Sequence, residues 1–341
     1  MRYKHTVLAA AVVALTFTAA CANQSVGTDA PTDAPVAYPT RTIQLMAPAA
    51  AGGGWDTTAR TLQKTLQTAG LLNGQTVEVR NVTGAGGTVG LAELVTSHAK
   101  DPYQLMVMGL VMVGGIITNK SPIDLSQTTP IATLTAEPEV IVVRADSKYQ
   151  TLKQLVDDVK ANPTSVKWGG GSAGGTDQIL VGLLAKTAGA DARQVAKQYV
   201  AYSGGGEVKA ALLSGDVSVA VSGASEFADL VKGGQLRALA VSGSKPSDAG
   251  ASSPTPTIRD GGYDLEFMNW RGIVAAPGIS ASEKAAITQL IDKLHASTAW
   301  KDALTQYKWD DFYKSGDAAT SFFGNESTRI KAVLTEAGVA G

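Results

Sequence analysis

The fold of this chain is decided by Pro48-Ala49-Ala50-Ala51-Gly52-Gly53-Gly54-Trp55-Asp56-Thr57-Thr58-Ala59-Arg60. This stretch joins an apolar strand pattern at 42–46 to a helix pattern at about 57–69. Three consecutive glycines allow a sharp turn and leave the amides uncovered, and Asp56 is of a type that caps helix starts. Unpaired N–H groups at a helix start attract anions. The loop therefore predicts either an anion site or a tight connection that binds nothing.

The order of strand, glycine loop and helix occurs four times, at 42–69, 77–98, 166–187 and 195–214. Such alternation predicts parallel α/β sheets. Ligands of these sheets bind in the crevice at the carboxyl ends of the strands, where the loops lie. We therefore expect the four loops to face one site.

The remaining pattern gives further elements. Short strands are expected at 103–108, 131–134, 140–143, 217–221, 236–241 and 267–276, and helices at 152–161 and from 282 onward; residues 110–117 are apolar and ambiguous. In the fourth repeat, 195–200 is expected to be the strand.

The N-terminus has the features of an export signal. Arg2 and Lys4 precede an apolar run at 6–20, which is shorter than the ~20 residues that span a bilayer, so 1–20 is predicted to be a signal peptide. Ala19-Ala20-Cys21 resembles a bacterial lipobox, with lipidation of Cys21 expected, although cleavage nearby is the alternative. Residues 21–40 would then form a lipidated N-terminus and flexible linker, which places the protein outside the cytoplasm on a lipid anchor.

Composition excludes several classes of function. A net charge of −1 on 341 residues gives no basic field for nucleic acid. After the signal segment only His98 and His295 are histidines, and Cys21 is the single cysteine, so neither a metal site nor a cofactor is expected.

Two enzyme motifs occur in the third loop. Gly169-x-Gly171-x-x-Gly174 matches a dinucleotide fingerprint, but the next predicted strand ends without the acidic residue that would hold a ribose. Gly170-x-Ser172-x-Gly174 matches a hydrolase nucleophile elbow. Its only downstream histidine is His295, in an amphipathic helix pattern. A secreted serine hydrolase using Ser172 remains the alternative to a non-enzymatic binding protein.

The motifs together resemble the extracytoplasmic solute receptors of the tripartite tricarboxylate transporter family, also called Bug-type receptors. The resemblance covers about residues 41–340. It rests on the order of these segments: Pro48…Gly52-Gly53-Gly54-Trp55-Asp56…Ala59-Arg60, Asn81-x-x-Gly84-Ala85-Gly86-Gly87, Gly171-Ser172-Ala173-Gly174-Gly175-Thr176, Tyr202-Ser203-Gly204-Gly205-Gly206, Gly234-x-Leu236-Arg237-Ala238-Leu239-Ala240, Pro254-Thr255-Pro256…Gly262-Tyr263 and Trp270-Arg271-Gly272…Ala276-Pro277-Gly278.

The resemblance implies an α/β, two-lobed periplasmic-binding-protein fold of type II, the Venus-flytrap form, with a hinge between lobes. One lobe would contain 41–142 and 268–341, and the other 143–267. A monomer would capture a citrate-like di- or tricarboxylate and deliver it to a large and a small membrane subunit, without using an arginine. The expected ligand contacts are Ala51, Gly52, Gly53, Gly54, Asp56, Thr57, Gly84, Ala85, Gly86, Gly87, Gly171, Ser172, Thr176, Tyr202, Gly204 and Gly205.

Overall fold

The computed structural model describes residues 1, 36–202 and 205–339. The predicted signal peptide, Cys21 and most of the predicted linker lie outside the described residues, as does Gly204. Within the described part of the chain, no helix combines the length and the apolar character that a membrane span requires.

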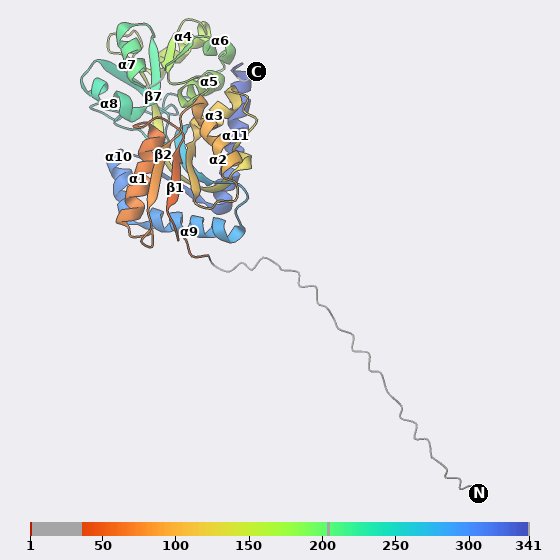
Figure 1. Cartoon of the computed structure of the whole chain (residues 1–341). Helices are drawn as coiled ribbons and strands as arrows, with labels where there is room; N and C mark the ends of the chain where they lie inside the picture. Colours follow the sequence, from red (N-terminus) through yellow and green to blue (C-terminus); the bar gives the residue numbers. More distant parts are fainter. Residues whose placement is uncertain (2–35, 203–204, 340–341) are drawn as a thin grey trace. The chain divides into compact units, whose positions relative to one another are not determined.

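The structure consists of ten strands and a larger set of helices in the described residues (Figure 1). The strands are β1 (Ile43–Ala47), β2 (Val77–Asn81), β3 (Gln104–Gly109), β4 (Thr129–Arg144), β5 (Trp168–Gly170), β6 (Tyr199–Ala201), β7 (Val219–Gly223), β8 (Leu236–Val241), β9 (Met268–Ala275) and β10 (Asp310–Ser315).

The helices alternate with these strands along most of the chain. They are α1 (Gly54–Thr68), η1 (Ala85–Gly87), α2 (Thr88–Ser97), α3 (Leu110–Thr118), η2 (Leu125–Gln127), α4 (Leu152–Ala161), α5 (Thr176–Ala188), α6 (Ala192–Ala196), α7 (Gly205–Ser214), α8 (Ala224–Lys232), α9 (Ala281–Ala296), α10 (Thr298–Tyr307) and α11 (Gly316–Glu336).

Strand β4 is shared by two groups of strands. Its first part, up to Pro138, pairs with β9 and β10, and β9 continues through β3 to the parallel strands β1 and β2. Its second part, from Glu139, pairs with β7 and β8, and β7 continues to the parallel strands β5 and β6. The predicted parallel strands are thus present, joined through antiparallel ones.

Several local predictions were wrong. The segments 131–134 and 140–143 are one continuous strand, β4, in which Pro138 lies at the change of partners, where its missing N–H is tolerated. The predicted strand 195–200 begins instead as helix α6, because Asp191 accepts hydrogen bonds from the amides of Arg193 and Gln194. Helix α8 and strand β10 were not predicted, and the ambiguous 110–117 belongs to α3.

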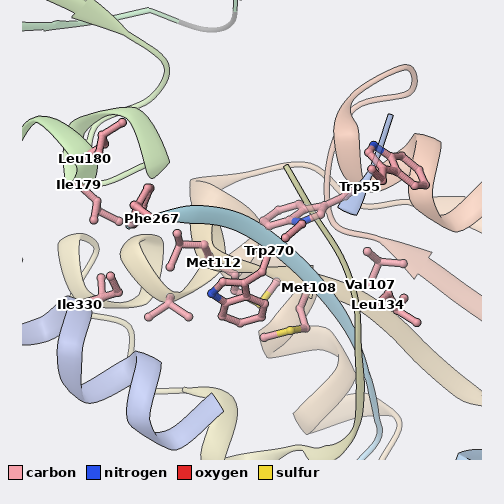
Figure 2. Close-up of a cluster of buried hydrophobic side chains, with 14 of the residues drawn as sticks. Trp55, Val107, Met108, Met112, Leu134, Ile179, Leu180, Phe267, Trp270 and Ile330 are labelled. Atoms are coloured by element: carbon pink, nitrogen blue, oxygen red, sulfur yellow. The ribbon is translucent and has the colours of Figure 1, made fainter. Parts of the chain in front are cut away.

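One apolar cluster extends across both strand groups. Ile179 and Leu180 of α5 lie in the same cluster as Met112 of α3 and Ile330 of α11 (Figure 2). Trp270 of β9 is 1% exposed, and its indole N–H donates to a Glu326 oxygen at 3.0 Å. The shared core and the shared strand together fix the walls between which a ligand would bind.

One close contact between helices α3 and α5 involves bare backbone. A Cβ on Gly114 of α3 would lie 1.8 Å from the carbonyl oxygen of Gly174, which precedes α5. We predict that Gly114→Ala lowers the free energy of unfolding by about 1–3 kcal/mol, as overpacking does. Urea denaturation measures this change, and unaltered stability would contradict the packing described.

The matched control is Gly324→Ala in α11. Gly324 is exposed, and a Cβ there would meet nothing within 4 Å. Because alanine is the better helix former, this substitution should raise the free energy of unfolding by about 0.5–1 kcal/mol.

Candidate functional site

A cavity of about 720 Å³ lies where β4 passes between the two strand groups. Loops one and three, predicted from their glycines, both line it. The predicted contacts found there are Gly52, Gly54, Thr57, Gly171, Ser172 and Thr176. An apolar cavity of about 810 Å³ beside α3 and α11 is larger, but no described residue of the four glycine loops lines it. The first cavity is therefore the candidate site.

Three helices begin at the wall of this cavity. The residues before them are Gly53 for α1, Gly175 for α5 and Gly223 for α8, and no side chain caps any of the three starts. Each start therefore presents unpaired N–H groups and a partial positive charge. Three such starts around one cavity form a favourable environment for an anion.

The prediction that Asp56 caps α1 was wrong. The helix begins earlier, and its N-cap is Gly53. Its buried carboxylate instead accepts hydrogen bonds from the Gly52 amide at 2.8 Å, Arg60 at 3.0 Å and Asn81 at 2.9 Å. Burial alone would raise the pKa of Asp56, but these bonds outweigh burial and lower it. Asp56 thus shapes loop one from behind the cavity.

Loop three is held in a similar way. The amides of Gly171 and Gly174 donate to Asp177 at 2.6 Å and to Gln178 at 2.7 Å. The Tyr199 hydroxyl donates to the Gly171 carbonyl at 2.7 Å. Those two amides are therefore occupied, while Ser172 is exposed at the cavity.

Loop two does not line this cavity. A Cβ on Gly86 would lie 3.1 Å from the Cα of Gly115 in α3, and Asn119 donates to the Ala85 carbonyl at 3.1 Å. Gly84 and Gly87 also have positive φ angles, of 134° and 89°. Here the glycines serve the turn and its packing on α3, and the expectation that 84–87 contacts the ligand stays a prediction.

Loop four and Ala51 are likewise absent from the lining residues of the described chain. The Tyr202 amide donates to the Gly170 carbonyl at 2.9 Å, and the Tyr202 ring packs on the apolar cluster around Val208. Gly205 is the first residue of α7. Gly53 is not among the lining residues either, but it is the N-cap of α1, whose start lies at the cavity wall.

The prediction missed an arginine. Arg271 of β9 lines the cavity, is 7% exposed and forms an ion pair with Glu137. Its Nη1 atom is buried without a hydrogen-bond partner among the residues described. A Cβ on Gly54 would lie 2.7 Å from Nη2, so the glycine makes room for the guanidinium beside the start of α1. Arg271 is the one charged residue in the apolar strand pattern at 267–276. That feature of the sequence could have indicated a binding role.

Four carboxylates also line the cavity, namely those of Glu137, Glu139, Asp177 and Glu226. Glu139 is fully buried, and burial raises its pKa well above the usual range, helped by the charges of Asp177, Glu137 and Glu226. Burial also raises the pKa of Asp177. None of these acids was predicted as a site residue, although Glu137-Pro138-Glu139 interrupts an apolar pattern.

The described lining of the cavity does not contain the histidine that a serine–histidine–acid triad would need beside Ser172. None of the residues lining the cavity is a histidine. His295 bonds to Asp311 at 2.9 Å and stacks on Tyr313, while His98 lies beside Glu93. The described residues contain no cluster of three or more His, Cys, Asp or Glu side chains that could hold a metal ion.

The family model described as "Tripartite tricarboxylate transporter family receptor" matches residues 58–339. The chain belongs to this family. Its members are extracytoplasmic solute-binding receptors and not enzymes, which confirms the resemblance read from the glycine loops and overturns the hydrolase alternative.

Relatives support the assignment along the chain. Protein BugT of Bordetella pertussis is 28% identical over 308 residues, covering 88% of this chain and 90% of that protein. A UPF0065 protein in the TAR-I ttuE-ttuC' intergenic region of Agrobacterium vitis is 28% identical over 316 residues, covering 88% and 86%.

Solved structures share the fold. A TctC solute binding protein from Polaromonas has a TM-score of 0.71 at 22% identity, covering 88% of this chain and 100% of that one. The R. palustris protein Rpa4515 with adipate has a TM-score of 0.71 at 22% identity, covering 89% and 99%. MatC from Rhodopseudomonas palustris with bound malate has a TM-score of 0.68 at 21% identity, and the match covers 87% of this chain and 100% of that one. The predicted two-lobed periplasmic-binding fold is confirmed.

We predict that Asp56→Asn weakens loop one. The substitution removes the ionised acceptor of Gly52 and Arg60, and should lower the free energy of unfolding by about 1–3 kcal/mol at pH 7. Because folding lowers the pKa of Asp56, its stabilisation is present above the unfolded pKa of about 3.9 and is lost as pH falls through the folded value.

Denaturation of wild type and variant at several pH values tests this. The two curves should converge on acidification, whereas Asp302→Asn, on the exposed surface of α10, should match wild type at each pH. A constant difference between wild type and Asp56→Asn would show that the charge is not responsible.

Proposed function

We propose that this receptor captures an organic carboxylate in the cavity and delivers it to the large and small membrane subunits of a tripartite transporter. The single observation that carries the proposal is the Arg271 guanidinium beside the uncapped start of α1, with Nη1 buried and unpartnered among the described residues. Leaving a buried donor unsatisfied is costly. A carboxylate can accept hydrogen bonds from a guanidinium and from helix amides at the same time, and so can satisfy these donors.

The expected strength of this contact is sufficient for a receptor. Hydrogen bonds to charged groups contribute roughly 1.5–3 kcal/mol each, while micromolar affinity needs about −8 kcal/mol. Arg271, the amides at the start of α1 and hydroxyls such as those of Thr57 and Ser172 supply several such bonds. Two structures of the same fold hold the dicarboxylates adipate and malate, which supports a ligand of this class.

We further propose that the two lobes are 41–142 with 268–341, and 143–267, and that they close over the ligand. The cavity is lined by Gly54 and Arg271 from the first and by Ser172 and Thr176 from the second. Burial between lobes reduces competition from water and offsets the cost of association.

Cys21 is proposed as the lipidated first residue of the mature chain, which mass spectrometry of the native N-terminus tests.

Replacing Arg271 tests the binding site. Arg271→Gln should weaken the best-binding carboxylate by about tenfold to a hundredfold, because a charge-assisted hydrogen bond of ~1.5–3 kcal/mol is lost. Isothermal titration measures the change. Arg259→Gln, which removes an exposed arginine paired with Asp264 and Glu266, is the matched control and should bind as wild type.

If the single variant fails to fold because Glu137 loses its partner, the double variant Arg271→Gln with Glu137→Gln removes both charges and keeps the test valid. Unchanged carboxylate affinity in a folded variant would place the site elsewhere.

Closure gives an independent measurement. Small-angle scattering should show a smaller radius of gyration with a bound carboxylate than without it. An unchanged radius, with binding confirmed by titration in the same sample, would show that the lobes do not move on binding.

A further inference from the structure

The cavity holds more acids than a carboxylate ligand alone would require. Glu137 and Glu139 alternate along β4 and so share a face, while Asp177 and Glu226 lie in the first turns of α5 and α8. A Cβ on Gly223 would lie 3.6 Å from a Glu137 oxygen and 4.0 Å from a Glu226 oxygen. The acids are therefore near neighbours at one part of the wall.

Three of the four acids already have partners within the protein that are not themselves acids. Glu137 pairs with Arg271. Asp177 accepts from the Gly171 amide at 2.6 Å and from the Thr176 hydroxyl at 2.9 Å. Glu226 has a hydrogen bond from the Ser222 side chain. Among the described residues, Glu139 alone therefore has no donor outside the group of acids.

Glu139 is the decisive residue. It is fully buried at the cavity wall, and neither of its carboxylate oxygens has a donor among the residues that the structure describes. Its side chain lies against that of Asp177, but two carboxylates form a hydrogen bond only when one holds a proton. Without a proton or an outside cation, a buried ionised group of this kind is strongly unfavourable.

We propose that the ligand carries a protonated amine as well as a carboxylate, and that Glu139 and Glu226 bind the amine. The inference rests on the proposed function, since Arg271 and the start of α1 would hold the carboxylate. Glu226 is exposed toward the cavity and offers an accessible oxygen acceptor beside the buried one. The ligand class is then the amino acids and related zwitterions.

An organic cation fits this wall better than a metal ion. Among the described residues, no three acids or histidines are arranged to surround a metal. An ammonium group needs fewer ligands, because each of its N–H bonds is satisfied by a single oxygen.

Binding of the amine should release a proton. Burial first, and then the neighbouring acids, raise the pKa of Glu139, while Arg271 lowers it. An ammonium beside Glu139 favours its ionised form, so the acid gives up its proton when the ligand binds. Affinity for an amine-bearing ligand therefore rises with pH through the release of this proton, whereas a ligand without the amine does not displace the proton of Glu139. The titratable or charged groups facing Glu139 are Asp177, Glu137, Glu226, Arg271 and Tyr199.

The test compares ligands that differ only in the amine. Isothermal titration of the full protein would use L-aspartate with succinate, L-glutamate with glutarate, and 4-aminobutyrate with butyrate. At least one amine-bearing member should bind tenfold or more tightly than its partner, with affinity rising from about pH 5 to pH 7, where the amine stays protonated. Its binding heat should also depend on the ionisation enthalpy of the buffer.

The outcomes separate the two proposals. If, in every pair that binds, the amine-free carboxylate binds as tightly as its amino counterpart, the amine site is wrong and the carboxylate receptor stands. If neither these compounds nor di- and tricarboxylates bind, both proposals are overturned.

Variants supply the residue-level test. Glu139→Gln should reduce affinity for the amine-bearing ligand at least tenfold and abolish the buffer dependence, while leaving the affinity for its amine-free partner equal or higher. Glu226→Gln, at an exposed position, keeps the test available if the buried change prevents folding. Asp229→Asn, one turn further along α8 and outside the cavity lining, is the control and should bind as wild type. Equal loss for both ligands would overturn the assignment.

Discussion

The hydrogen bonds of Ser242 join the segments on which the arrangement of both strand groups depends. Its amide donates to the Glu139 carbonyl at 2.9 Å, and its hydroxyl accepts from the Glu139 amide at 2.9 Å. The same hydroxyl donates to the Phe267 carbonyl, and the Phe267 amide donates to the Ser242 carbonyl at 2.8 Å. Because β4 changes partners at this point, one small side chain compensates for ladder bonds that the strand cannot form there.

Glycine at three helix starts explains how the cavity can attract an anion at little expense to stability. Glycine before a helix is less favourable than a capping serine or asparagine by only a few tenths of a kcal/mol, and it leaves the amides uncovered. At α1 the next glycine, Gly54, has a separate role, because a Cβ at that position would lie 2.7 Å from Nη2 of Arg271. Gly53 thus leaves the amides of α1 uncovered, and Gly54 makes room for the guanidinium.

The sequence predicted the elements whose causes are local. The first three strand–loop–helix units and the positions of loops one and three follow from glycines and apolar period. In the fourth unit the strand was predicted too early, because helix α6 occupies the start of that segment. Loop two has a similar glycine pattern, yet it packs on α3, since the pattern does not tell which neighbour the loop will meet. Arg271 and Glu139 were missed for the same reason: their meeting depends on the register of β4 with β9 and β7, a long-range pairing that no local pattern contains.

The meeting of Gly114 with Gly174 has a mechanical consequence. Where side chains touch, rotamers can adjust gradually as two surfaces slide. At this point main-chain atoms face each other, and the flanking Thr118 side chain already fills the space that a Cβ on Gly174 would need. The contact is therefore either made in full or broken, so it acts as a rigid stop. A stop of this kind defines how far α3 and α5 can approach, whatever molecule lies in the cavity.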